Sequence, residues 1–251
     1  MMSMSQSEVT FEGEIPVLSG AKRPVLALVP AWNEADRVGP VVRGAGAYLP
    51  VLVVDDGSRD GTSAAAQEAG AVVVRHPCNR GKGSALTTGL HYGLEQGYEA
   101  VVTLDADGQH DPAEIPKFLA AYDAGDGDLQ LVIGRRNFGQ MPFPRRYTNP
   151  IFGAWLLSLA LRTPIHDSQS GYRMYGRRLL TQLDLTTTGF DWEVEVIVQA
   201  VCLRMRIGWV DIRTIYGVGE VSYFHPVRDS LRFGRMVWCA WRRRRGLDFE
   251  R

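Results

Sequence analysis

The stretch Val101–Asp111 reads Val-Val-Thr-Leu-Asp-Ala-Asp-Gly-Gln-His-Asp, and it decides the fold of this chain. The run Ala100–Leu104 is aliphatic and largely β-branched, a pattern typical of a strand buried in a parallel sheet. Asp105, Asp107 and Gln109 alternate directly after this run. Open α/β sheets bind their ligands at the carboxyl ends of their strands, so a ligand site is expected here.

Two carboxylates and an amide oxygen are hard ligands that suit Mg²⁺ or Mn²⁺. We therefore expect a divalent metal at Asp105, Asp107 and Gln109, with an anion such as a diphosphate completing its shell. An EF-hand loop is excluded, because His110 and Pro116 stand where Gly and Glu would be needed. The Asp-x-Asp pair also resembles the loop of aspartate-dependent phosphatases, but that loop usually follows the first strand. The alternative is a solvated turn in which the acidic residues occur by chance. We expect His110 to be a turn residue rather than a ligand.

The composition is that of a soluble α/β domain. The chain has 251 residues, 45% hydrophobic and 22% charged, and its net charge of zero gives no argument for a nucleic-acid partner. Three widely spaced cysteines (Cys78, Cys202 and Cys239) are expected to be reduced thiols in a cytosolic protein. No secretory signal is visible in residues 1–23, and the longest apolar segment, Ile151–Leu161, is shorter than the ~20 residues that span a bilayer.

Strand-like and helix-like segments alternate before residue 105, which predicts a mainly parallel sheet flanked by helices. Strands are expected at Val25–Val29, Val51–Val54, Ala71–Val74, Ala100–Leu104, Gln130–Gly134 and Trp209–Tyr216. Helices are expected at Val38–Leu49, Thr62–Ala69, from about Asn79 to Gln96, at Pro112–Asp123 and at Phe190–Arg204.

Polar loops follow the early strands. Pro30–Glu34 comes after the first strand and Asp55–Thr62 after the second, and such loops offer carboxylates to a sugar or a base. Lys82 lies between two glycines at a helix start, which suits either a phosphate or a simple helix cap. The segment is not a P-loop, because His76 stands where its first glycine would be.

The last part of the chain is basic and amphipathic. Val227–Arg245 places apolar residues, including Trp238 and Trp241, on one helical face with arginines along its flank. This pattern indicates contact with a membrane surface, although a solvated tail has the same charge pattern.

Taken in order, the motifs resemble the family 2 nucleotide-sugar glycosyltransferases of the GT-A fold, over residues 24–235. The closest likeness is to the dolichol-phosphate mannose synthase-like and polyprenyl-phosphate glycosyltransferases. The matching segments are Pro30–Glu34, Val53–Ser58, Asp105–Asp107 with Gln109, Gly134–Arg136, Asp167–Arg173 and Val210–Arg232. Many proteins of this kind carry two transmembrane helices after the catalytic domain. We find no such segment here and expect docking by amphipathic segments or by a separate membrane protein.

The resemblance implies a role for each matching residue. The nucleotide sugar would contact Pro30, Trp32, Asn33, Glu34, Val54, Asp55, Asp56, Lys82, Asp105 and Ala106, and the metal would bind Asp105, Asp107 and Gln109. Phosphate and acceptor contacts are expected at Arg136, Arg145, Arg146, Ser170 and Arg173, and catalysis at Asp107, Arg136 and Asp167. A lipid phosphate acceptor would need no general base. A sugar hydroxyl would need one, for which Asp167 or Glu193 are candidates. Each of these residues has an alternative interpretation. Arg145 and Arg146 could be solvated loop charges, and Glu193 could only favour the start of a helix.

We therefore expect a flexible tail at 1–23, a GT-A catalytic domain at 24–225 and a basic amphipathic segment at 226–251. The implied activity is inverting transfer of a hexose, mannose or glucose, from a GDP- or UDP-sugar to a polyprenyl or dolichyl phosphate. The enzyme would lie at the cytoplasmic face of a membrane. The alternatives are a soluble or polysaccharide hydroxyl acceptor, a non-catalytic nucleotide-sugar-binding subunit and, more distantly, a nucleotidyltransferase.

Overall fold

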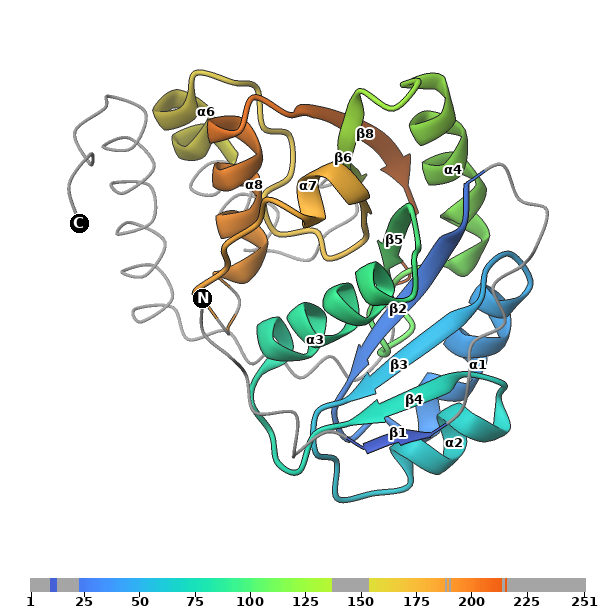
Figure 1. Ribbon diagram of the computed structural model, residues 1–251. Helices are drawn as coiled ribbons and strands as arrows, with labels where there is room; N and C mark the ends of the chain where they lie inside the picture. The colour runs from blue at the N-terminus through green and yellow to red at the C-terminus, as the bar shows by residue number, and fades with distance from the viewer. Residues whose placement is uncertain are drawn as a thin grey trace.

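The structure is a computed structural model that describes residues 10–12, 23–136, 154–187, 189, 191–213 and 215. Its elements alternate along the chain as the sequence predicts (Figure 1). The strands are β1 (Thr10–Glu12), β2 (Val25–Ala31), β3 (Val51–Asp55), β4 (Val72–Arg75), β5 (Ala100–Thr103), β6 (Leu129–Arg136), β7 (Arg173–Gly176) and β8 (Arg206–Ile212). The helices are α1 (Ala35–Gly46), α2 (Thr62–Glu68), α3 (Lys82–Glu95), the short 3₁₀ helix η2 (Pro112–Glu114), α4 (Ile115–Ala124), α6 (Leu156–Leu161), α7 (Arg177–Leu180) and α8 (Trp192–Cys202).

The strands form one sheet in the order β1-β4-β3-β2-β5-β7-β6-β8. The neighbours β4, β3, β2 and β5 are parallel, and β6 is parallel to β8. The mainly parallel α/β fold is thereby confirmed. Strand β7 differs, because it runs antiparallel between β5 and β6 and was not predicted. It places the loop that precedes Arg173 next to the end of β5.

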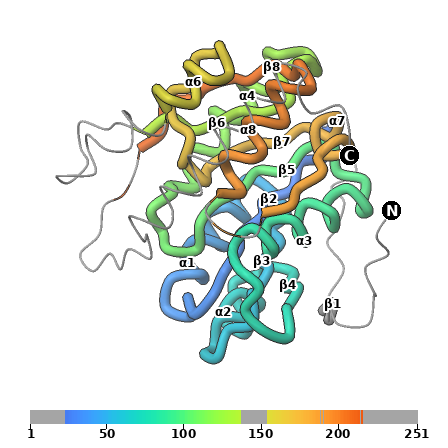
Figure 2. The backbone as a smooth tube through the Cα atoms, turned by 90° about the vertical axis from the view of Figure 1, so that its left-hand side faces the viewer, coloured from blue at the N-terminus to red at the C-terminus, as the bar shows by residue number. Residues whose placement is uncertain are grey.

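Helices cover both faces of the sheet, as the alternating side chains of β2 require. Leu26 and Leu28 belong to the core under α3, α7 and α8, whereas Ala27 and Val29 belong to the core under α1, α2 and α4. Both views place α6 near α8 and far from α2 (Figure 1, Figure 2). Gly89 lets α3 approach β2 closely, since a Cβ there would meet Leu28 Cδ1 at 2.2 Å. This contact fixes the position of the helix that begins with Lys82.

Several predicted features need correction or fall outside the described part. Residues 10–12 of the expected tail form β1, which pairs antiparallel with β4. Helix α1 begins at Ala35 rather than at Val38, and β8 ends at Ile212 rather than near Tyr216. Arg145, Arg146 and the segment 226–251 lie outside the described residues. In the part of the chain that the structure describes, no helix combines the length and apolar character that crossing a bilayer requires.

Candidate active site

The turn after β5 carries the predicted metal ligands. Asp107 Oδ1 accepts a hydrogen bond from the Gln109 amide at 2.9 Å, and the Asp105 amide donates to His110 Nδ1 at 3.0 Å. Gly108 has φ +78°, a conformation that suits glycine. His110 packs against Tyr172, with ring centroids 5.0 Å apart. Burial lowers the pKa of His110, which agrees with a neutral ring whose Nδ1 accepts the amide proton.

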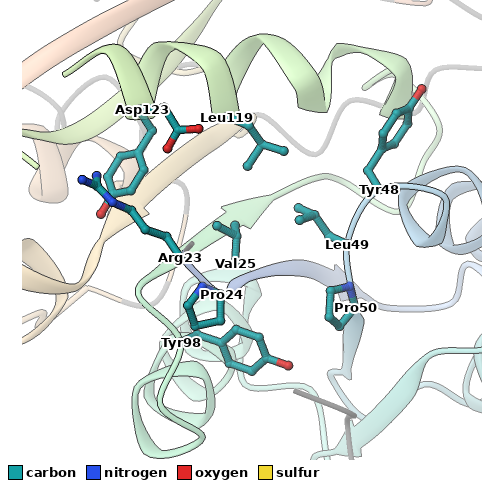
Figure 3. A pocket seen from close by; sticks show the side chains of 10 residues that line it. Arg23, Pro24, Val25, Tyr48, Leu49, Pro50, Tyr98, Leu119 and Asp123 are labelled. Atoms are coloured by element: carbon teal, nitrogen blue, oxygen red, sulfur yellow. The ribbon is translucent and has the colours of Figure 1, made fainter. Parts of the chain in front are cut away.

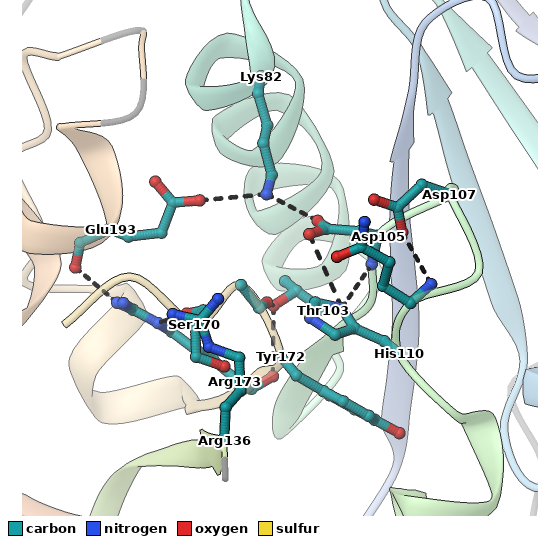
Figure 4. A network of polar contacts seen from close by, with 12 residues as sticks. Lys82, Thr103, Asp105, Asp107, His110, Arg136, Ser170, Tyr172, Arg173 and Glu193 are labelled. Carbon is teal, nitrogen blue, oxygen red and sulfur yellow. Dashed lines mark hydrogen bonds and ion pairs between the residues drawn. The ribbon is translucent and has the colours of Figure 1, made fainter. Parts of the chain in front are cut away.

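Lys82, at the start of α3, contacts two carboxylates from distant parts of the chain. Its Nζ lies 2.7 Å from Asp105 Oδ1 and 3.2 Å from Glu193 Oε1 on α8 (Figure 4). Burial favours a lower pKa for Lys82, but Asp105 and Glu193 outweigh it and raise that pKa above its ordinary value. Burial likewise favours a higher pKa for Asp105, yet Lys82, followed by His110, lowers it to about 2. The site therefore contains an ionised carboxylate and an ammonium in direct contact. No pattern in the sequence indicated that Glu193 would contact Lys82.

Asp55 and Asp56 are buried and engaged within the protein. The Asp56 carboxylate accepts from the Gly81 amide at 2.7 Å and from the Arg80 amide at 3.0 Å, and its Oδ1 lies 2.7 Å from His76 Nδ1. Asp55 Oδ1 accepts from the Ser58 amide at 2.8 Å. We expected both carboxylates to contact the nucleotide. Their positions favour a different role, since Asp56 fixes the chain directly before Lys82.

The loop after β2 is tied to the loop after β3. Asn33 has φ 54°, its amide donates to Ser58 Oγ at 2.9 Å, and its Oδ1 accepts from the Arg59 amide at 2.9 Å. The Glu34 amide donates to Thr62 Oγ1 at 2.8 Å. Of the other residues expected to contact the nucleotide sugar, Pro30, Val54 and Ala106 are buried, whereas Trp32 is exposed.

Arg136, at the end of β6, is held by a two-pronged ion pair. Its Nε lies 2.7 Å from Asp167 Oδ2, and its Nη2 lies 2.9 Å from Asp167 Oδ1. Asp167 also accepts from the amides of Gln169 and Ser170 at 3.0 and 3.1 Å. Asp167 is buried, and its two oxygens are occupied. The geometry of Asp167 suits a residue that orients Arg136 better than it suits a general base.

Arg173 does not lie where a phosphate would reach it. The side chain is fully buried, and it donates to the carbonyl oxygens of Ser170 at 2.6 Å, Ser168 at 2.9 Å and Glu193 at 2.5 Å. Ser170 is fully buried as well. The contact with phosphate that we expected at these two residues is therefore not supported. Arg173 instead joins the loop before β7 to the start of α8.

Gly171 brings this loop against the ion pair. Its carbonyl accepts from Thr103 Oγ1 at 2.7 Å, which fixes the loop to β5. A Cβ at Gly171 would lie 3.0 Å from Lys82 Nζ and 3.1 Å from Asp105 Oδ2. A side chain here would require Lys82 or Asp105 to shift by a few tenths of an ångström, so glycine suits the pair. The chain thus uses Gly171 to form one wall of the site, a role that its place in a Ser-Gly-Tyr-Arg motif did not indicate.

The donor set fits a divalent cation that takes further ligands from a substrate. Asp105 and Asp107 offer carboxylate oxygens from one turn, and Gln109 adds an amide. Burial raises the pKa of Glu34, and the negative charge of Asp107 adds to this effect although Arg37 opposes it. Negative charge is therefore concentrated here. No cluster of three His, Cys, Asp or Glu side chains suited to a metal occurs among the described residues, so the remaining ligands would come from phosphate and water, as is usual for Mg²⁺.

A separate hollow lies at the opposite edge of the sheet, near the start of β2 (Figure 3). It is lined by Arg23, Tyr48, Tyr98 and Asp123, among others, and contains none of the predicted site residues.

The sequence and the fold of this chain are similar to those of known proteins. The model of the family described as glycosyl transferase family 2 matches residues 27–184. Polyprenol monophosphomannose synthase of Mycolicibacterium smegmatis is 32% identical over 86% of this chain and 83% of that protein. Undecaprenyl-phosphate mannosyltransferase of Micrococcus luteus is 32% identical over 75% of this chain and 82% of that protein.

Solved structures with the same fold include glucosyl-3-phosphoglycerate synthase from Mycobacterium tuberculosis in complex with Mn²⁺, UDP and glucosyl-3-phosphoglycerate. It has a TM-score of 0.68 and 21% identity, and the match covers 90% of this chain and 81% of that one. At this identity the likeness concerns the fold.

Proposed function

Because this chain belongs to glycosyl transferase family 2, we propose that it moves a hexose from a nucleotide sugar to a polyprenyl phosphate, with inversion at the anomeric carbon. It is a glycosyltransferase by family. The names of its relatives support the acceptor, since two of them are a polyprenol-phosphate and an undecaprenyl-phosphate mannose enzyme. Mannose is accordingly the first sugar to test, with glucose second, carried by GDP or UDP.

The observation that carries the proposal is that two cations, Lys82 and Arg136, act on Asp105. Lys82 touches Asp105 directly, and Arg136 lies near enough to help lower the pKa of Asp105. A reaction between a nucleotide sugar and a lipid phosphate brings two phosphate groups to one site. Lys82 suits the diphosphate of the donor, and Arg136, oriented by Asp167, suits the phosphate of the acceptor.

Asp105, Asp107 and Gln109 would hold Mg²⁺ or Mn²⁺, which supplies positive charge to the leaving diphosphate. The chain's own residues position the two substrates. An acceptor phosphate is already an anion at neutral pH and needs no proton removed, which agrees with the occupied carboxylate of Asp167. Positioning and electrostatic stabilisation would then supply most of the catalysis.

One observation favours a second candidate, transfer to a sugar hydroxyl. Glu193 is buried, and its Oε2 has no hydrogen-bond partner among the described residues. A carboxylate of this kind suits a general base, which a hydroxyl acceptor requires.

Peripheral membrane contact is part of the proposal. Trp155 and Leu159 lie one helical turn apart at α6, and 60% and 65% of their surfaces are exposed. Exposed Trp and Leu on one helix face suit the boundary of a bilayer. The cytoplasmic face, expected from the sequence, is part of the same proposal.

A donor and acceptor screen tests the function. Nucleoside diphosphate release would be measured with Mn²⁺ and GDP- or UDP-sugars, with and without a short polyprenyl phosphate. We expect release that requires the lipid phosphate. Release that instead requires a sugar alcohol would favour the hydroxyl acceptor. Nucleotide binding without release under either condition would contradict both candidates and favour a non-catalytic subunit.

A further inference from the structure

We infer that Lys82 is a movable counter-ion. Its ammonium pairs with Asp105 until a donor diphosphate attracts it, and this movement couples donor binding to metal binding. This inference rests on the proposed function, because it concerns the same donor and metal site. It assigns to Lys82 and Glu193 a role in deciding when Asp105 becomes available as a ligand. Glu193 is a positioning residue in this scheme.

Lys82 and a metal ion would compete for one carboxylate, that of Asp105. Lys82 Nζ lies 2.7 Å from Asp105 Oδ1, which is the distance of a strong charge-assisted hydrogen bond. A divalent cation on Asp105 would meet the ammonium at close range, and two like charges at such a distance repel each other strongly. Metal binding to Asp105 is therefore disfavoured while Lys82 remains in place.

Glu193 offers the Lys82 ammonium a second carboxylate partner. Glu193 Oε1 lies 3.2 Å from Nζ, on the side away from Asp105 (Figure 4). Its Oε2 is buried and has no hydrogen-bond partner in the described part of the chain. A buried carboxylate oxygen without a partner is costly. Lys82 can thus leave Asp105 while staying in contact with a negative charge, and Glu193 gains from the closer approach.

The backbone is fixed here, while the Lys82 ammonium has room beside it. Gly171 leaves that room, because a Cβ there would lie 3.0 Å from Lys82 Nζ. The backbone directly before Lys82 is held by Asp56 through the Gly81 amide at 2.7 Å. Only the side chain of Lys82 is then left to change position. A diphosphate at the start of α3, where helix amides favour an anion, would give the ammonium a stronger partner than Asp105 alone.

Linkage gives this idea a measurable form. If a nucleoside diphosphate removes Lys82 from Asp105, it must raise the affinity for metal, and the metal must raise the affinity for nucleotide by the same factor. The measured quantity is the ratio of the Mn²⁺ dissociation constant without nucleotide to that with nucleotide. Direct coordination of Mn²⁺ by phosphate contributes to this ratio in every variant. Lys82 contributes only where it is present.

The experiment titrates Mn²⁺ against the full-length protein and follows the free-ion signal by electron paramagnetic resonance, with no nucleotide, with GDP and with UDP. Lys82→Gln should bind Mn²⁺ alone about tenfold more tightly than the wild type and should lower the ratio by a similar factor. Glu193→Gln should weaken Mn²⁺ binding without nucleotide, because Lys82 loses its second anchor. Lys117→Gln removes the same charge from a half-exposed lysine that pairs with the buried Glu114, and it should leave the ratio unchanged.

Two results would overturn the inference. If Lys82 stays in place in both states, Lys82→Gln will tighten Mn²⁺ binding equally with and without nucleotide and leave the ratio at its wild-type value. If Lys82 plays no part, Mn²⁺ binding will not change at all. Circular dichroism would establish that each variant is folded. Failure of the wild type to bind GDP or UDP with Mn²⁺ would instead contradict the proposed function itself, and the inference with it.

Discussion

Arg136 and Asp167 meet through two hydrogen bonds of 2.7 and 2.9 Å, although 31 positions separate them in the chain. The contact joins the end of β6 to the loop before β7. Because Asp167 is buried and also accepts two backbone amides, it holds the guanidinium of Arg136 in one orientation. The pair gives the site a fixed cation, whose charge acts on Asp105 in the predicted metal-binding turn.

Asp167→Asn should lower the rate of transfer by about 10- to 100-fold and leave nucleotide binding with Mn²⁺ within about twofold, because it disturbs the orientation of Arg136 and no donor contact. Steady-state release of nucleoside diphosphate would be compared with a binding titration. The matched control is Asp211→Asn, which breaks a similar two-pronged pair with the neighbouring Arg135 at an exposed position. Equal losses in both variants would contradict a specific role for Asp167.

Arg173→Met should lower the free energy of unfolding by about 3 kcal/mol, because three buried carbonyl oxygens lose a charged donor. Urea unfolding followed by circular dichroism would measure this. Arg178→Met, at an exposed position of α7, should change stability by less than about 0.5 kcal/mol. A stable Arg173→Met variant that had lost phosphate binding would restore the role expected from the sequence.

Asp107→Ala should abolish most metal-dependent turnover, by about 100-fold or more, while the thermal midpoint changes by only a few degrees. The side chain contributes one hydrogen bond within its own turn, to the Gln109 amide, so little stability is lost. Turnover would be measured over a range of Mn²⁺ concentrations. Asp128→Ala, at an exposed position near Arg206, serves as the control. Full activity of Asp107→Ala at low Mn²⁺ would remove Asp107 from the metal site.

The contact between Lys82 and Asp105 should make stability depend on acidity. The pKa of Asp105 in the folded protein is about 2, below the ordinary 3.8, so the folded state binds a proton less readily than the unfolded state. The stabilisation is therefore present above about pH 4 and is lost as the pH falls toward 2. Urea midpoints at pH 5 and pH 3 should differ more in the wild type than in Asp105→Asn. The same difference in both proteins would show that other carboxyl groups dominate.

A double substitution of Trp155 and Leu159 by serine should reduce sedimentation with anionic lipid vesicles at least severalfold, because it removes two exposed apolar side chains from one face of α6. Nucleotide binding should not change. Tyr48→Ser alters an aromatic residue that is 43% exposed elsewhere on the surface, and it should leave sedimentation as it was. If the double variant still sediments like the wild type, α6 is not the membrane contact.

The sequence was sufficient for the elements whose signals are local. Strands β2, β3, β4 and β5 lie within a residue or two of their predicted bounds, because each is a continuous apolar run that ends in polar residues. The turn that carries the predicted metal ligands follows β5 as expected. These features depend on neighbours in the chain, and a pattern of residues therefore predicts them.

Features that depend on distant partners were not predicted. Helix α1 begins at Ala35 because side chains from the next loop, Asp60 and Thr62, accept the amides of Ala35 and Glu34. Strand β7 is only four residues long, and its place in the sheet is fixed by pairing with β5 and β6. Likewise, the three carbonyl partners of Arg173 belong to two separate segments, and a local pattern cannot distinguish such an arginine from one at the surface.

The cross-links between the loops after β2, β3 and β4 have a consequence for protein engineering. Asn33 is bonded to Ser58 and Arg59, and Asp56 is bonded to Arg80 and Gly81, so the three loops share one set of contacts. Exchanging one loop for that of another enzyme would leave hydrogen-bonding groups on the other two loops without their partners. A graft intended to change the nucleotide preference of this chain should transplant all three loops together, as a single module.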